Sequence, residues 1–347
     1  MATATMVIHF RLSRPRPEWH SCYNAAITKR RSALFSKLKP IPFLYRVLGP
    51  AGLARLAGPF RVRPARLPGR VRQSIMAESH VMTANAADRV APLGTVSPTI
   101  EAEAGAIERE LRAAGKPGRA DREKAYLKSD LEFAGTPTAD IRSVAKAWSS
   151  ARPGLAHDDL LEVTAALWAR PVFECRAAAV ELLRHRLALL RAGDAAQLEA
   201  MLRTSHTWAL VDSLAEHVMG GLTEAFPQLT ATLDRWAGDE DFWVRRSALL
   251  ALLGPLRRGG GDFGRFGRYA DTMLTEREFF IRKAIGWVLR DTARRRPEMV
   301  AQWLAPRIHL ASGITVREAV KPLAPGTREM LMAGYRGKYP VALAPPH

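Results

Sequence analysis

The chain has 347 residues and a formal net charge of +18, and this length leaves room for one or two ordinary domains. Its two cysteines, Cys22 and Cys175, are too few for a disulfide framework or a cysteine metal site. No apolar run approaches the roughly eighteen residues that a membrane span requires. Disulfide-rich secreted proteins and membrane-spanning proteins are therefore excluded, and we expect a reducing, cytoplasmic setting with no membrane partner.

The positive charge is unevenly distributed. Residues 1–75 hold 15 of the 52 Lys and Arg but only one acid, Glu18, so the remainder of the chain carries a net charge of only +4. Three interpretations stay open for this segment: a disordered basic arm, an organelle transit peptide, or a spurious extension upstream of a true start at Met76 or Met82. We favour the last, because ordinary composition begins at Met76. The expected organisation is an extension over 1–75, a linker over 76–97, a helical domain over 98–335 and a tail over 336–347.

From Pro98 onward the apolar spacing predicts helices almost throughout. The first expected helix covers 100–114, the second ends near Leu131, and Thr138 is expected to cap a third. Further helices are expected at 158–169, 174–190, 194–202, 227–236, 243–256, 266–274, 278–294 and 298–308, with a weaker pair reaching about 335. No stretch alternates with the period of a strand for long.

Helices in antiparallel pairs that recur about every 35–45 residues are typical of an all-α fold of the α-solenoid type, built from HEAT-like or armadillo-like repeats. No clean sequence repeat is visible, and an irregular helical bundle is the alternative. The glycine-rich stretch 257–262 lacks the Gly-Lys-Ser/Thr ending of a phosphate-binding loop and follows no strand, so we interpret it as a loop between helices.

One stretch, 205–212 (SHTWALVD), has unusual chemistry. Ser205 or Thr207 can cap a helix there, and Trp208 and Asp212 are four residues apart, so both lie on one helical face. A carboxylate beside an indole suits a site that stabilises a cation, through negative charge and through the π face of the ring. The alternative is a buried Trp and a surface Asp paired with an Arg.

Several other stretches, together with 205–212, carry a resemblance to a known family. They are 126–128 (YLK), 241–248 (DFWVRRSA), 278–290 (EFFIRKAIGWVLR) and 317–320 (REAV). In order and spacing they resemble the AlkD-like DNA alkylation repair glycosylases, from about residue 104 to 324. The segment 279–290 is the most specific part of the match.

The resemblance implies a HEAT-like solenoid that cleaves the N-glycosidic bond of cationic N3- and N7-alkylated purines in duplex DNA, without flipping the lesion into a pocket. It places the catalytic carboxylate on Asp212 and the two lesion-facing tryptophans on Trp208 and Trp287. It places a DNA-backbone Arg on Arg246, although the neighbouring Arg245 blurs that choice, and a further residue near the DNA on Tyr126. Thr207 and Ala209, on either side of Trp208, depart from the family pattern.

The same residues make chemical sense without the resemblance. An alkylated purine is already cationic and needs no general acid in order to leave. A carboxylate at Asp212 would stabilise the oxocarbenium ion that forms on the deoxyribose and would orient a water. We expect double-stranded DNA as the partner, no metal or cofactor, a monomer, and association with the nucleoid when the protein is on DNA. The rival hypothesis is a non-catalytic solenoid that binds damaged or branched nucleic acid, or a protein.

Overall fold

The computed structural model of the protein describes residues 97–343, so the expectations for residues 1–75 and for the linker up to residue 96 lie outside the described part. The helices in the first half are α2 (Pro98–Ala113), α3 (Arg119–Leu127), α4 (Thr138–Ser150), α5 (His157–Ala169), α6 (Phe173–His185), α7 (Ala195–Arg203), α8 (Trp208–Ser213) and α9 (Gly220–Ala225). Those in the second half are α10 (Thr230–Trp236), α11 (Phe242–Ala251), α12 (Leu253–Arg257), α13 (Phe263–Met273), α14 (Phe279–Ala293), α15 (Pro297–Leu304), α16 (Gly313–Ala319) and α17 (Pro325–Gly337). β-Structure in residues 97–343 is limited to one isolated parallel bridge.

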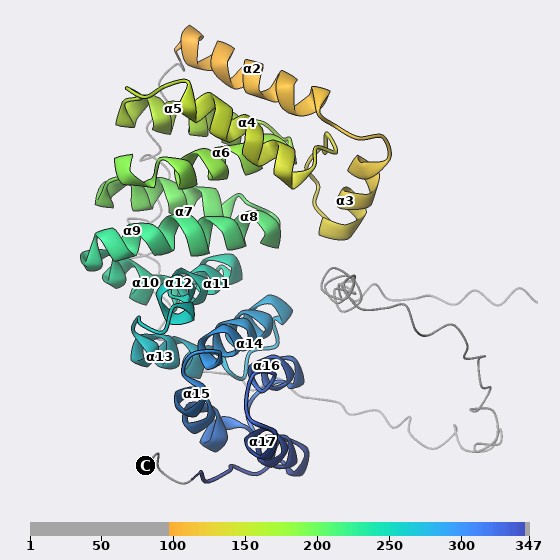
Figure 1. Ribbon diagram of the computed structural model, residues 1–347, viewed down its shortest axis with the longest axis vertical. Helices are drawn as coiled ribbons and strands as arrows, with labels where there is room; N and C mark the ends of the chain where they lie inside the picture. The colour runs from red at the N-terminus through yellow and green to blue at the C-terminus, as the bar shows by residue number, and fades with distance from the viewer. Residues whose placement is uncertain (1–96, 344–347) are drawn as a thin grey trace, which may run out of the picture. The chain divides into compact units, whose positions relative to one another are not determined.

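The fold is the expected all-α solenoid, in which helix pairs stack one after another from α2 to α17 (Figure 1). One row of helices runs through α4, α6, α8, α11, α14 and α16, each in contact with the next. We call these six helices the inner row. Within the described residues no helix combines the length and the apolar character that a membrane crossing requires.

Side-chain caps explain where several helices begin. The side chains of Thr207, Asp241, Glu278 and Ser312 each accept a hydrogen bond from a backbone N–H in the first turn of the helix that follows, which satisfies a donor that a helix start otherwise leaves unpaired. The expected cap at Thr138 is wrong, because α4 already includes Thr138 and its N-cap position is Pro137. The glycines of the 257–262 stretch lie between α12 and α13, and the stretch is a loop as expected.

The repeat that the sequence hides is visible in the polar contacts. Side chains 31 to 39 residues apart pair from one helix pair to the next, as in Arg203–Asp239, Arg257–Asp291 and Arg307–Asp271, where each pair is 34 to 36 residues apart. These pairs join successive repeats. A solenoid repeat contacts only its neighbours, so such ties hold the stack in register.

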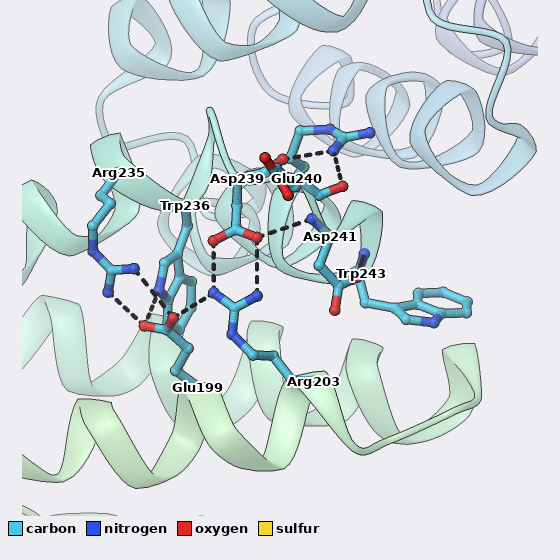
Figure 2. A network of polar contacts seen from close by, with 9 residues as sticks. Glu199, Arg203, Arg235, Trp236, Asp239, Glu240, Asp241 and Trp243 are labelled. Atoms are coloured by element: carbon cyan, nitrogen blue, oxygen red, sulfur yellow. Dashed lines mark hydrogen bonds and ion pairs between the residues drawn. The ribbon is translucent and has the colours of Figure 1, made fainter. Parts of the chain in front are cut away.

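One such network connects α7 to the loop before α11 (Figure 2). Glu199 accepts hydrogen bonds from Arg203 at 2.6 Å, from Arg235 at 2.5 Å and from the indole of Trp236 at 2.8 Å. Arg203 also binds both carboxylate oxygens of Asp239. Hydrogen bonds from Arg235 foremost, and then from Arg203 and Trp236, lower the pKa of Glu199 to about 2.

Replacing Glu199 by Gln should reduce the pH dependence of stability. A carboxylate with a lowered pKa stabilises the folded state above its unfolded pKa and loses this contribution as the pH falls through its folded pKa. We therefore expect the wild-type free energy of unfolding to fall more steeply than that of Glu199→Gln between pH 4.5 and 2, the ordinary and folded pKa values of this group. Urea unfolding at stepped pH measures both slopes, and equal slopes would contradict the role given to Glu199.

Candidate active site

Helix α8 begins where the sequence predicted. The Oγ1 atom of Thr207 accepts a hydrogen bond from the backbone N–H of Ala209 at 3.5 Å, whereas Ser205 is buried and donates to the carbonyl of Met201. Of the two expected caps, Thr207 is therefore the one used. Trp208 is the first residue of α8 and Asp212 the fifth, so Asp212 follows Trp208 by about one turn.

Asp212 forms a bidentate ion pair with Arg246 of α11. Arg246 Nε lies 2.7 Å from Oδ1 of Asp212, and Nη2 lies 2.9 Å from Oδ2. The third nitrogen, Nη1, donates to the backbone carbonyl of Phe280 in α14, so one guanidinium connects α8, α11 and α14. The side chain of Arg246 is 0% exposed and that of Asp212 is 12% exposed. A ligand that approaches this pair therefore meets its negative end.

The burial of Arg246 corrects a sequence expectation. The resemblance implies a DNA-backbone contact at Arg246, but this side chain is fully buried and all three of its nitrogens are used within the protein. Arg245 is also occupied: it binds both oxygens of Glu276 at 3.0 and 2.9 Å and donates to the carbonyls of Asp239 and Glu240. Arg246 has no exposed surface with which to contact a phosphate, and Arg245, which is 18% exposed, already pairs with Glu276.

The structure brings Tyr126 and Trp208 together. Their ring centroids are 5.9 Å apart and their planes stand at 85°, an edge-to-face contact between α3 and α8. Both side chains are half-buried. Tyr126 thereby supports the indole of Trp208 from the side of α3.

Trp287 lies in the middle of α14 and is held by a different set of polar groups. Its indole N–H donates to Asp291 at 3.0 Å, and Asp291 also accepts from Arg257 at 3.0 Å. Arg257 in turn binds Glu216, which stands four residues after Asp212. Trp287 is therefore connected, through two carboxylates and one guanidinium, to the helix that carries Asp212. The sequence analysis missed Asp291, Arg257 and Glu216.

A second feature that the sequence analysis missed follows directly after Asp212. Residues Leu214–Met219 form a π-helical turn between α8 and α9. Such a turn inserts an extra residue and rotates the helical faces on its two sides, and it is frequently found at functional sites. Here it lies between α8, which carries Trp208 and Asp212, and α9, and it packs on α11 and α12.

Four inner-row helices share one sequence pattern. A capping residue precedes the helix, the third helical residue is buried, and the fifth helical residue is charged. The charged residues at this fifth position are Asp212, Arg246, Lys283 and Arg317. Their spacing of 34, 37 and 34 residues is the repeat that seemed absent from the sequence. Asp212 is the one acid of this series, and its cationic neighbour Arg246 binds it.

The next member of the series, Lys283, is also buried. Its ammonium lies 2.7 Å from Glu318, a carboxylate that also binds Arg290 at 2.6 Å and Lys321 at 2.8 Å. Burial alone would raise the pKa of Glu318, but the hydrogen bonds from Lys283 and Lys321 bring it down to about 2. Three cations around one carboxylate leave the surroundings of α14 and α16 electropositive.

Together these contacts define a helical-repeat protein with an anchored carboxylate beside an aromatic pair, in surroundings that carry extra positive charge. A family model described as DNA alkylation repair enzyme matches residues 107–323. The chain belongs to this family.

The chain was also compared with solved structures. A structure titled "Predicted DNA alkylation repair enzyme from Enterococcus faecalis" superposes with a TM-score of 0.56 at 24% identity and covers 61% of this chain and 97% of that one, which shows a common fold. AlkD2 from Streptococcus mutans gives a TM-score of 0.45 at 13% identity, over 65% of this chain and 99% of that one. A comparison with curated proteins gave no match.

Proposed function

We propose that the protein is a DNA glycosylase that hydrolyses the N-glycosidic bond of cationic N3- and N7-alkylated purines in duplex DNA. The observation that carries the proposal is the Asp212–Arg246 pair, which exposes only its carboxylate, one turn from the Trp208–Tyr126 contact. Membership of a DNA alkylation repair family supplies the substrate class. Trp287 is proposed as the second aromatic contact to the lesion.

The bidentate bond fixes the plane of the carboxylate before substrate arrives. An ionised carboxylate has about four lone-pair sites and Arg246 uses two of them, so each oxygen keeps acceptor capacity toward solvent. Preorganised charge of this kind stabilises a transition state without reorganisation at the moment of reaction. Arg246 is thus a positioning residue for Asp212. Its positive charge also offsets part of the negative charge of the carboxylate.

The proposed reaction needs little else from the protein. The alkylated purine carries a positive charge and departs as a neutral base when the bond from C1′ to nitrogen breaks. The positive charge then resides on the deoxyribose as an oxocarbenium ion, which the Asp212 carboxylate faces. Water adds to C1′ and loses a proton to solvent or to the carboxylate, leaving an abasic site. The half-buried indoles of Trp208 and Trp287 would contact the cationic sugar or base, each contributing roughly 0.5–2 kcal/mol.

Release of 7-methylguanine from methylated duplex DNA tests the proposal. We expect free base in the supernatant and an equal amount of abasic sites in the DNA, with none from unmethylated duplex. Chromatography with mass detection measures the base. DNA binding without base release would favour the non-catalytic solenoid instead.

A further inference from the structure

Half-buried aromatic rings recur at the first residue of three successive inner-row helices. They are Trp208 of α8, Phe242 of α11 and Phe279 of α14. Adjacent helices pack about 8–10 Å apart, so rings at equivalent positions follow one edge of the solenoid. Trp208 is the member of this row next to Asp212, and the other two have no part in the site described above.

Trp243, the second residue of α11, adds a larger surface to this edge. Its ring lies 4.4 Å from Phe242 and 4.8 Å from Phe280, centroid to centroid. No hydrogen bond joins its indole N–H to any residue in the described part of the chain, and its ring points away from the neighbouring ion pairs (Figure 2). A half-buried indole with an unused donor is typical of a surface that contacts a partner.

This aromatic edge is continuous with the candidate active site. Phe280 is buried, its carbonyl accepts a hydrogen bond from Arg246, and its ring lies 5.7 Å from the Arg246 guanidinium carbon. Phe279 contacts Phe280 edge-to-face at 5.3 Å. The rings of Trp243 and Phe279 are therefore packed on the residue that Arg246 binds, next to the carboxylate.

Two of the acids at this edge do not repel a polyanion, because basic side chains of the protein bind them. Asp239 is bound by Arg203 through both oxygens, and Glu276 by Arg245 through both oxygens. Glu240 stays exposed beside them, so the aromatic faces are the features of this edge that favour contact with a polyanion. Aromatic faces stack on any base or sugar and need no particular sequence, which suits an enzyme that must search all DNA.

We propose that Trp243, with Phe242 and Phe279, forms a second DNA contact, where an aromatic surface meets the base or deoxyribose faces of nucleotides beside the lesion. The proposal rests on the proposed function and deepens it by adding residues that determine DNA affinity. Trp243 touches no reacting atom in this proposal, so it is a binding residue.

Photocrosslinking tests the contact directly. A duplex with a stable abasic-site analogue carries 5-iodouracil at one of several positions beside the analogue, and crosslinked peptides are mapped by mass spectrometry. We expect a crosslink at Trp243 or Phe279. In parallel, Trp243→Ala should weaken binding of this duplex roughly five-fold or more, the scale of lost base–aromatic stacking. The slope of log affinity against log salt should not change, because no phosphate contact is lost.

Trp148→Ala is the matched control, since Trp148 is another half-buried Trp, on α4, packed under Arg152 at 4.3 Å. It should bind DNA as wild type does, and Trp243→Phe should keep most of the affinity and the melting temperature. Suppose that the wild-type protein releases base, that Trp243→Ala binds DNA as tightly as wild type, and that no crosslink forms at this edge. This result would overturn the inference and leave the proposed function intact. If the wild-type protein neither releases base nor binds DNA, the proposed function is wrong and the inference falls with it.

Discussion

The Asp212→Asn variant should lose most excision of 7-methylguanine, by about 10²–10³-fold, the usual effect of deleting one preorganised electrostatic contact. Asparagine keeps the shape of the side chain but removes the negative charge that faces the oxocarbenium ion. Binding to a duplex with an uncharged abasic analogue should change little, whereas binding to a cationic sugar mimic should weaken. Single-turnover excision and the two affinities measure these effects.

The same substitution should also destabilise the protein. Arg246 is fully buried and donates two hydrogen bonds to the Asp212 carboxylate. An asparagine at position 212 can accept only one of them and leaves the guanidinium charge uncompensated. Excision must therefore be expressed per folded molecule, at temperatures well below the melting transition. Glu199→Gln is the matched control, because it too breaks hydrogen bonds to Arg, in the network shown in Figure 2. Normal turnover per folded molecule in Asp212→Asn would end the catalytic assignment.

The second large effect is expected at Arg246. Arg246→Met should lower the free energy of unfolding by about 3 kcal/mol or more, because Asp212 would keep its charge in a largely buried place without a partner. Excision should fall as well, since the carboxylate loses the bidentate bond that orients it. Urea unfolding and single-turnover kinetics report the two losses.

The salt dependence of DNA binding decides what kind of residue Arg246 is. A residue that contacts a phosphate changes the slope of log affinity against log salt by about one when it is removed. We expect Arg246→Met to leave this slope unchanged, because the side chain is 0% exposed. Arg317→Ala removes an exposed cation from the same position of α16 and is the control for lost charge without lost stability. The double variant Asp212→Leu with Arg246→Met should regain stability but not excision. A change of the salt slope in Arg246→Met alone would show that Arg246 contacts a phosphate.

Several predictions made from the sequence are confirmed because they depend on residues close together in the chain. The helices, the cap at Thr207 and the one-turn spacing of Trp208 and Asp212 follow from residues close together in the chain. Cys175 lies in the alanine-rich helix α6 and is buried, and this burial raises the pKa of its thiol to about 12.

The sequence predictions that were wrong or incomplete concern features that depend on which helices pack together. Arg245 and Arg246 were the candidates for a DNA-backbone contact, and sequence spacing gave no sign that one binds Glu276 and the other Asp212, 31 and 34 residues away. The repeat was missed for a related reason. It is carried by three positions in each helix, namely a cap, a buried third residue and a charged fifth residue, and the residue types at these positions vary.

The sequence by itself therefore determined that this chain is an all-α repeat protein of a DNA alkylation repair family, and it indicated the carboxylate and indoles on which the proposed chemistry rests. Only the tertiary structure decided that Arg246 is buried against Asp212 and that Trp243 joins an aromatic edge beside it. The physical reason is one of range. Helix formation and capping depend on neighbours within about four residues. The charge and accessibility of the site depend on side chains one repeat away, which meet only when the helices stack.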